Sequence, residues 1–229
     1  MAIAESQASD SPSLSEVQDT FHTFVTRDEF PCLGARATVG QDACTIDLFG
    51  SLGDDRDIAR LSDHLHRFGK SIEESDRSYN SFVAVFPSLP PNTEAEFDER
   101  AWKHLQLLSD SDKSSSWASG RSDKPNDPEF SFSFAGVPYF VVGLFPLSSR
   151  TARQFAWPAL VFNPHALFDR LREDGNYERM KSLIRERDVA LQGTLNPNLA
   201  DFGEISEARQ YTGARHGHEW QCPFHRKAG

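Results

Sequence analysis

Two apolar runs separated by a short turn constrain the fold of this chain more than any other part of its sequence. The first run is Phe-Ser-Phe-Ser-Phe at 130–134, and the second is Tyr-Phe-Val-Val-Gly-Leu-Phe at 139–145. The four residues between them, 135–138, are Ala-Gly-Val-Pro, and glycine with proline in so short a connection is typical of a tight turn. The pattern predicts an antiparallel β-hairpin.

Other segments alternate between strand and helix patterns, which sets the fold class. Apolar runs predict strands at 44–49, 81–87 and 159–162. Apolar residues at helical spacing predict helices over 15–26, from 54 to about 68, from Thr93 to about 108, and roughly over 164–173 and 176–190. Residues 30–35 are expected to form a buried turn, and 204–210 a short exposed helix. Mixed elements with a hairpin predict an α+β fold around a largely antiparallel sheet.

The length of 229 residues allows one sizeable domain. We expect a disordered Ser/Asp-rich tail at 1–12, a single domain over 13–229, and a long loop at 109–128 that Trp117 anchors to the body. No run of about twenty apolar residues is present, which argues against a membrane span. The acidic N-terminus lacks a secretory pattern and three cysteines are too few for a disulfide framework, so a reduced, cytoplasmic protein is expected.

Charge and motifs exclude several common functions. A net charge of -10 argues against a nucleic-acid partner, because such a protein needs a basic face to displace counterions from phosphate. The sequence has neither GxGxxG nor GxxxxGK[ST], which removes the usual dinucleotide and P-loop sites. It also lacks GxSxG and HExxH, the signatures of many hydrolases and metalloproteases.

His165 follows an apolar strand and precedes a helical pattern. Asn163 suits a helix N-cap and Pro164 the first helical position, which would place His165 in the first turn. The positive end of a helix dipole disfavours imidazolium, so the ring would be neutral and able to bind a metal. The alternative is a helix-start histidine that only packs or bonds to backbone, and residue spacing by itself favours this alternative.

Charged and sulfur-containing side chains supply further candidates. Arg150 and Arg153 would lie on one side of a turn, an arrangement suited to carboxylate or phosphate, or only to solvent. Glu204 and Glu207 belong to a carboxylate group at 191–211 that could hold a cationic substrate or form a well-bonded loop. Near the C-terminus, Cys222 lies among histidines whose spacing fits no usual zinc pattern, but its thiolate could hold heme iron.

The longest distinctive motifs resemble a known family. The segment LQGTLNPNLADFGEISEARQY at 191–211, the run SFVAVF at 81–86 and the block EFPCLGA at 29–35 are similar to blocks of the YqcI/YcgG family. The likeness extends from about Glu29 to Phe224. Characterised relatives are heme-dependent N-hydroxylases that act on guanidino or amino compounds in the biosynthesis of metabolites such as guanitoxin and cycloserine.

The resemblance implies a cofactor, a reaction and a set of site residues. This chain would bind heme b, activate oxygen or peroxide, and hydroxylate a nitrogen of a small guanidino or amino compound, such as an arginine-like amino acid. His165 matches a histidine of the family's block and becomes the leading axial ligand, with Cys222 as its rival. The remaining candidates are Arg150 and Arg153 for the heme propionates, Glu204 and Glu207 for the cationic nitrogen of the substrate, and Phe140, Phe162 and Phe168 for the faces of the macrocycle.

One position departs from the family's pattern. Residues 143–146 read Gly-Leu-Phe-Pro, whereas the family has a histidine where Phe145 stands. A non-catalytic heme-binding or heme-sensing protein of the same fold is therefore the alternative. A third class, a small-ligand or partner-binding domain without heme, also stays open, as does assembly into a homodimer.

Overall fold

The computed structural model describes residues 11–73, 79–112, 117–196, 198 and 203–227. The predicted tail lies almost wholly outside these residues, as does part of the predicted loop. The elements in chain order are α1 (Leu14–Thr26), α2 (Leu33–Gly40), β1 (Cys44–Leu48), α3 (Ile58–Glu73), β2 (Ser81–Val85), α4 (Glu94–Ser111), β3 (Phe132–Phe134), β4 (Val137–Leu144), η1 (Thr151–Arg153), β5 (Ala159–Pro164), α5 (Ala166–Glu173), α6 (Tyr177–Gln192) and α7 (Ala208–Tyr211).

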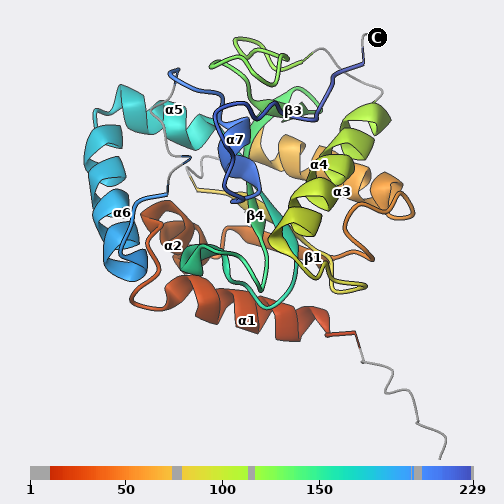
Figure 1. The fold of residues 1–229 in the computed structure, drawn as a ribbon, viewed down its shortest axis with the longest axis horizontal. Helices are drawn as coiled ribbons and strands as arrows, with labels where there is room; N and C mark the ends of the chain where they lie inside the picture. The colour runs from red at the N-terminus through yellow and green to blue at the C-terminus, as the bar shows by residue number, and fades with distance from the viewer. Residues whose placement is uncertain (1–10, 74–78, 113–116, 197, 199–202, 228–229) are drawn as a thin grey trace, which may run out of the picture.

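The strands form one five-stranded sheet in the order β1-β2-β5-β4-β3 (Figure 1). β1 pairs with β2 in parallel, and the other three pairings are antiparallel. The predicted α+β class with a largely antiparallel sheet is therefore confirmed. No helix in the described part of the chain is long and apolar enough to cross a lipid bilayer.

The hairpin that the sequence predicts is formed by β3 and β4, with Phe134 opposite Val137. Its two-residue turn consists of Ala135 and Gly136, whose φ angles are 53° and 76°. Two successive positive φ values define a type I′ turn, whose twist matches that of the flanking strands. The turn is thus shorter than the four-residue connection expected, because Val137 and Pro138 already belong to β4.

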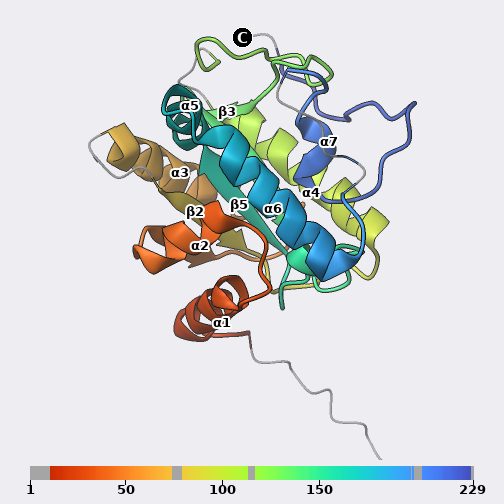
Figure 2. The ribbon, with the colours of Figure 1, turned by 90° about the vertical axis from the view of Figure 1, so that its left-hand side faces the viewer.

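Helices cover both faces of the sheet, and the alternation of side chains along the strands sorts them into two cores. β2 is buried along its whole length: Phe82 and Ala84 point into a core with α3 and α4, while Val83 and Val85 face α1. In Figure 2, α6 crosses in front of β5 on the same side as α1 and α2. This third helix over the α1 side is the element that shapes the candidate site.

Local signals predicted most helix starts and missed one. Thr93 caps α4 as expected, since its Oγ1 accepts from Glu96 N at 3.1 Å. The expected turn at 30–35 is wrong, because α2 begins at Leu33 with Cys32 as its N-cap. A helix is also present near 204–210, but it is the short α7 and begins at Ala208.

Gly143 marks a close contact between β4 and α4. A Cβ at this position would lie 2.8 Å from Cε1 of Phe97 and 3.1 Å from the carbonyl oxygen of Tyr211. Gly143→Ala is therefore expected to lower the free energy of unfolding by about 1–3 kcal/mol through overpacking, measured by urea denaturation. Gly40→Ala at the end of α2 is the control, since its Cβ would meet no atom within 4 Å. Equal stability of the two variants would contradict this packing.

Burial of His104 makes the stability of the fold depend on pH. Its ring is 1% exposed, its Nδ1 accepts from Gly53 N at 3.1 Å, and burial lowers its pKa to about 4. The unfolded chain then binds more protons than the folded chain between pH 6.5 and 4, so stability is lost as the pH falls through this window. The linked loss is at most about 3 kcal/mol. Urea unfolding at pH 7 and pH 4.5 should show a smaller loss in His104→Asn than in the wild type, and equal losses would refute the assignment.

Candidate functional site

A cavity lies between α6 and the sheet because the α5–α6 pair stands off the body of the protein. α5 has no buried residue, and of the sixteen residues of α6, all within the described chain, Asp188 alone is buried. Two adjoining cavities of about 170 and 320 Å³ run beneath these helices. They share six lining residues, Phe140, Phe168, Met180, Ile184, Arg185 and Gln210. We call the two cavities together the α6 hollow.

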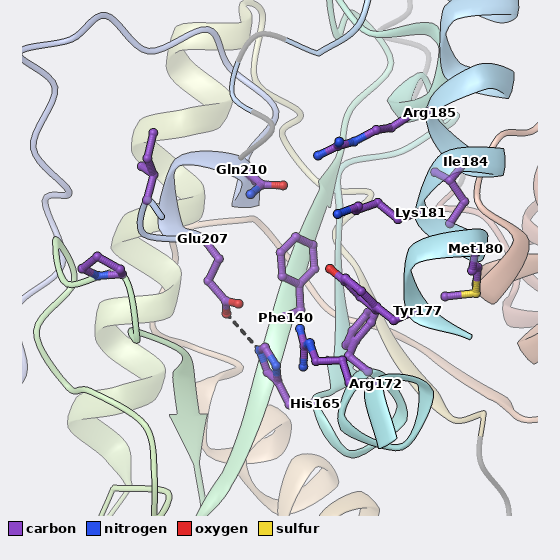
Figure 3. Close-up of a pocket in the computed structure, with 13 residues that line it drawn as sticks. Phe140, His165, Arg172, Tyr177, Met180, Lys181, Ile184, Arg185, Glu207 and Gln210 are labelled. Carbon is purple, nitrogen blue, oxygen red and sulfur yellow. Dashed lines mark hydrogen bonds and ion pairs between the residues drawn. The ribbon is translucent and has the colours of Figure 1, made fainter. Parts of the chain in front are cut away.

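The walls of the α6 hollow are mainly apolar. Phe140 and Val142 of β4 are only partly buried, whereas Tyr139 and Val141, on the other face of the strand, are fully buried. One face of β4 is therefore incompletely covered by protein. From the opposite side, α6 presents Met180 and Ile184, four residues apart on one helical face (Figure 3). Such a space suits a largely apolar ligand.

His165 lines the smaller cavity, but its local setting differs from the sequence prediction. Asn163 and Pro164 are the last residues of β5 and do not cap a helix. The Asn163 side chain instead bonds Ser81 Oγ at 2.7 Å and the Phe140 carbonyl oxygen at 3.1 Å. His165 itself occupies the N-cap of α5, and its backbone N–H donates to the Pro138 carbonyl at 3.0 Å. The sheet therefore fixes the backbone from which the ring projects.

The imidazole belongs to a buried polar network. His165 is 2% exposed, and its Nε2 lies 3.0 Å from Glu207 Oε1 (Figure 3). The same nitrogen lies 3.0 Å from Ser131 Oγ. Tyr211 donates from its hydroxyl to the same Oε1 at 2.5 Å. Burial, followed by the charge of Glu207, raises the pKa of Tyr211, so it is a donor at neutral pH. Two groups far apart in the sequence, the Ser131 hydroxyl and the Glu207 carboxylate, thus hold one imidazole nitrogen, and Tyr211 supports the carboxylate.

The other imidazole nitrogen has a different environment. Nδ1 of His165 is buried and has no hydrogen-bond partner among the described residues. If Nε2 carries the proton that it donates to Glu207, Nδ1 keeps a lone pair. The serine and the carboxylate meet the same nitrogen, so the group is no Ser–His–carboxylate triad, which needs one partner at each nitrogen. An imidazole with one nitrogen hydrogen-bonded to a carboxylate and the other without a partner can act as a metal ligand.

The two predicted arginines lie beside the hollow but have protein partners. Arg150 is buried and donates to Asp188 Oδ2 at 2.5 Å and to the Thr194 carbonyl at 3.0 Å. Arg153 donates to the carbonyl oxygens of Gly143, Gln210 and Tyr211. Burial, and then the charge of Arg150, lowers the pKa of Arg153 to about 10. Arg150 thus ties η1 to α6, and Arg153 ties η1 to β4 and α7.

The remaining predicted residues separate into two groups. Phe168 lines the hollow, with its ring centroid 5.9 Å from that of His165. Phe162 does not line it and packs on the other face of the sheet against Phe82 and Phe132. Glu207 bonds to His165, whereas Glu204 is exposed and lines neither cavity. Of the two carboxylates predicted to bind substrate, Glu207 therefore lies at the hollow and Glu204 does not.

Cys222 and Phe145 also lie away from the hollow. Cys222 is buried in the core that contains α3 and α4, and burial raises the pKa of its thiol to about 12. Phe145 is buried in the same core and stacks on Phe97 with ring centroids 5.1 Å apart. Within the described residues, no three His, Cys, Asp or Glu side chains form a group able to hold a metal ion, so the histidines near Cys222 do not assemble one.

Several side chains of the site carried no clear signal in the sequence. Arg172, Lys181 and Arg185 reach from α5 and α6 toward the hollow (Figure 3). Arg172 also pairs with Asp169 at 2.9 Å, and Lys181 pairs with Glu178 at 2.6 Å. Lys181 and Arg185 share a helical face with Ile184, so the spacing on α6 was the available signal. Ser131 had no such signal, because its hydrogen bond joins residues 34 positions apart.

The fold and the buried His165–Glu207 pair define an α+β domain with a histidine site beside an apolar cavity. The chain belongs to the YqcI/YcgG family, whose sequence model matches residues 21–225. It is similar to the uncharacterized protein YqcI of Bacillus subtilis (strain 168), with 27% identity over 207 residues that cover 86% of this chain and 81% of that protein. No solved structure gave a significant match.

Proposed function

We propose that this protein is a heme-dependent N-oxygenase that hydroxylates a nitrogen of a small guanidino or amino compound. The observation that carries the proposal is His165: a buried imidazole beside the α6 hollow, with Nε2 anchored and Nδ1 without a partner. A buried nitrogen without a hydrogen-bond partner is energetically costly, and a bound metal ion would satisfy it. Heme b bound in the hollow would supply iron able to activate dioxygen or peroxide.

The residues around the hollow fit such a group. Phe140, Phe168 and Ile184 offer the apolar walls that a macrocycle needs. The heme propionates are anionic, and Arg172, Lys181 and Arg185 bring cationic groups to this cavity, although the first two also pair with carboxylates of α5 and α6. Arg150 stays a candidate for a propionate, but it would have to share its guanidinium with Asp188.

The chain's own residues would orient the reactants and limit water. With peroxide, the reaction R–NH2 + H2O2 → R–NHOH + H2O needs no further electrons. With dioxygen, R–NH2 + O2 needs two electrons and two protons from a reductant, and it yields R–NHOH and water. Gln210 lines both cavities and can accept a hydrogen bond from a substrate nitrogen. The apolar walls would exclude water from the reacting nitrogen.

The alternative, a non-catalytic heme protein, depends on Phe145 replacing a histidine of the family. Phe145 lies in the core on the face of the sheet opposite the hollow, so the replacement removes no side chain from the cavity. The position therefore gives no reason to prefer a sensor, and we keep the oxygenase as the proposed function.

The direct test is turnover by protein reconstituted with heme. Incubation with arginine-like and simple amino compounds, with peroxide or with a reductant in air, should yield a product heavier by one oxygen atom whose N–OH group is identified by mass spectrometry and NMR. A heme-loaded protein that yields no such product with any compound would refute the oxygenase. A protein that binds no heme would refute the heme proposal altogether.

A further inference from the structure

We infer that Glu207 is the carboxylate partner of the iron ligand His165, a positioning residue that sets the ligand's donor strength, and that Tyr211 limits this effect. The inference rests on the proposed function, since it concerns the residues behind the heme ligand. It also reassigns Glu207, which the sequence suggested as a substrate-binding residue together with Glu204.

The first step is the placement of Glu207 relative to the ring. Its Oε1 lies 3.0 Å from His165 Nε2, and the residue is 7% exposed. Metal-bound histidines almost always donate their other ring N–H to a carboxylate, a carbonyl or water, which fixes the tautomer and raises the basicity of the ligand. Glu207 provides this contact on the side of the ring away from the unpartnered Nδ1. With its proton on Nε2 toward Glu207, the ring would keep the lone pair of Nδ1 for the iron.

The second step concerns Tyr211, which donates to the same oxygen atom. Its hydroxyl lies 2.5 Å from Glu207 Oε1, and the hydroxyl oxygen accepts from Phe132 N at 3.0 Å. A donor on Oε1 withdraws negative charge from the atom that accepts the His165 proton. Tyr211 thus weakens the carboxylate as an acceptor, and its removal would strengthen the pull on the imidazole N–H.

The third step excludes substrate binding as the main role of Glu207 Oε1. Two side chains already occupy Oε1, at hydrogen-bonding distances of 3.0 and 2.5 Å. A buried carboxylate oxygen with two partners has little capacity left for a substrate cation. Glu204, in contrast, is exposed and contacts neither His165 nor the hollow, which makes it a matched control with the same charge three residues away.

The experiment uses full-length protein loaded with heme and reads out the iron–ligand bond. We compare the wild type, Glu207→Gln, Tyr211→Phe and the control Glu204→Gln by resonance Raman of the ferrous form and by redox titration. Glu207→Gln should lower the Fe–His stretching frequency, raise the reduction potential, and weaken heme binding by about 10–100-fold. Tyr211→Phe should shift the frequency and the potential in the opposite direction.

The opposite signs separate an electronic role from damage to the fold. Both variants could loosen the site, but loosening alone would move the frequency and the potential the same way in each. Heme bound through His165 with Glu207→Gln indistinguishable from Glu204→Gln would overturn the inference and leave the proposed function intact. A wild-type protein that binds heme but shows no Fe–His band would overturn the inference alone, whereas a wild-type protein that binds no heme would overturn both.

Discussion

His165→Ala is expected to abolish the Soret band of protein produced with a heme supply. The variant removes the nitrogen that we propose as the iron ligand, and no other histidine lines the α6 hollow within the described residues. The side chain is 2% exposed, so alanine also leaves a small void, which imidazole added to the solution could occupy. The measurement is the absorbance spectrum of purified variant and wild type, with and without imidazole.

Cys222→Ala is the matched control for this experiment. Burial raises the pKa of the Cys222 thiol to about 12, and the residue lies in the core with α3 and α4, so its loss should leave the spectrum unchanged. If Cys222→Ala abolished the band and His165→Ala did not, the thiolate would be the ligand and the site described here would be wrong.

Arg150→Ala is expected to produce the largest loss of stability. The Arg150–Asp188 pair joins η1 to α6 at 2.5 Å, with side-chain exposures of 8% and 12%. Alanine would leave Asp188 as a buried charge without its guanidinium partner, which costs about 3–5 kcal/mol in the free energy of unfolding. Because Asp188 is also the buried residue of α6, the same variant should loosen that helix and weaken heme binding. Urea denaturation and hydrogen exchange of α6 measure the two effects.

Two further variants test whether the loss of stability comes from the buried Arg150–Asp188 pair. Arg150→Met combined with Asp188→Leu should recover much of the stability, because a buried pair can be replaced by apolar groups of similar size. Arg56→Ala should change stability little, since the Arg56–Asp54 pair is on the surface. A loss in Arg150→Ala no larger than in Arg56→Ala would show that the buried pair does not hold α6.

Much of the fold could be predicted from local patterns. The β3–β4 hairpin follows from its turn residues, and Thr93 with Glu96 indicated the start of α4. The order of the strands in the sheet could not be predicted, because the parallel β1–β2 pair and the insertion of β5 between β2 and β4 depend on contacts far apart in the sequence. The start of α2 was missed because a cysteine cap is a weak signal.

The candidate site was predicted only where a residue carried its own signal. His165 was identified from its position between a strand and a helix and from the family resemblance. Its partners Ser131 and Glu207 are 34 and 42 residues away, so no spacing rule joins them. Phe162 was wrongly predicted to lie against the heme. Its side chain alternates with its neighbours along β5, but the sequence does not show which face of the sheet each set of side chains occupies. The partners of His165 and the position of Phe162 depend on distances in the folded chain, which residue types do not give.

The central claim is that the α6 hollow holds heme on His165, and equilibrium titration of the purified protein with hemin tests it most directly. The titration is followed at the Soret maximum, for the wild type and for Ile184→Trp, whose larger side chain would fill the hollow from α6. We predict saturable binding of one heme per chain by the wild type and much weaker binding by Ile184→Trp. A wild-type spectrum that remains that of free hemin, or equally tight binding by the filled variant, would contradict the claim.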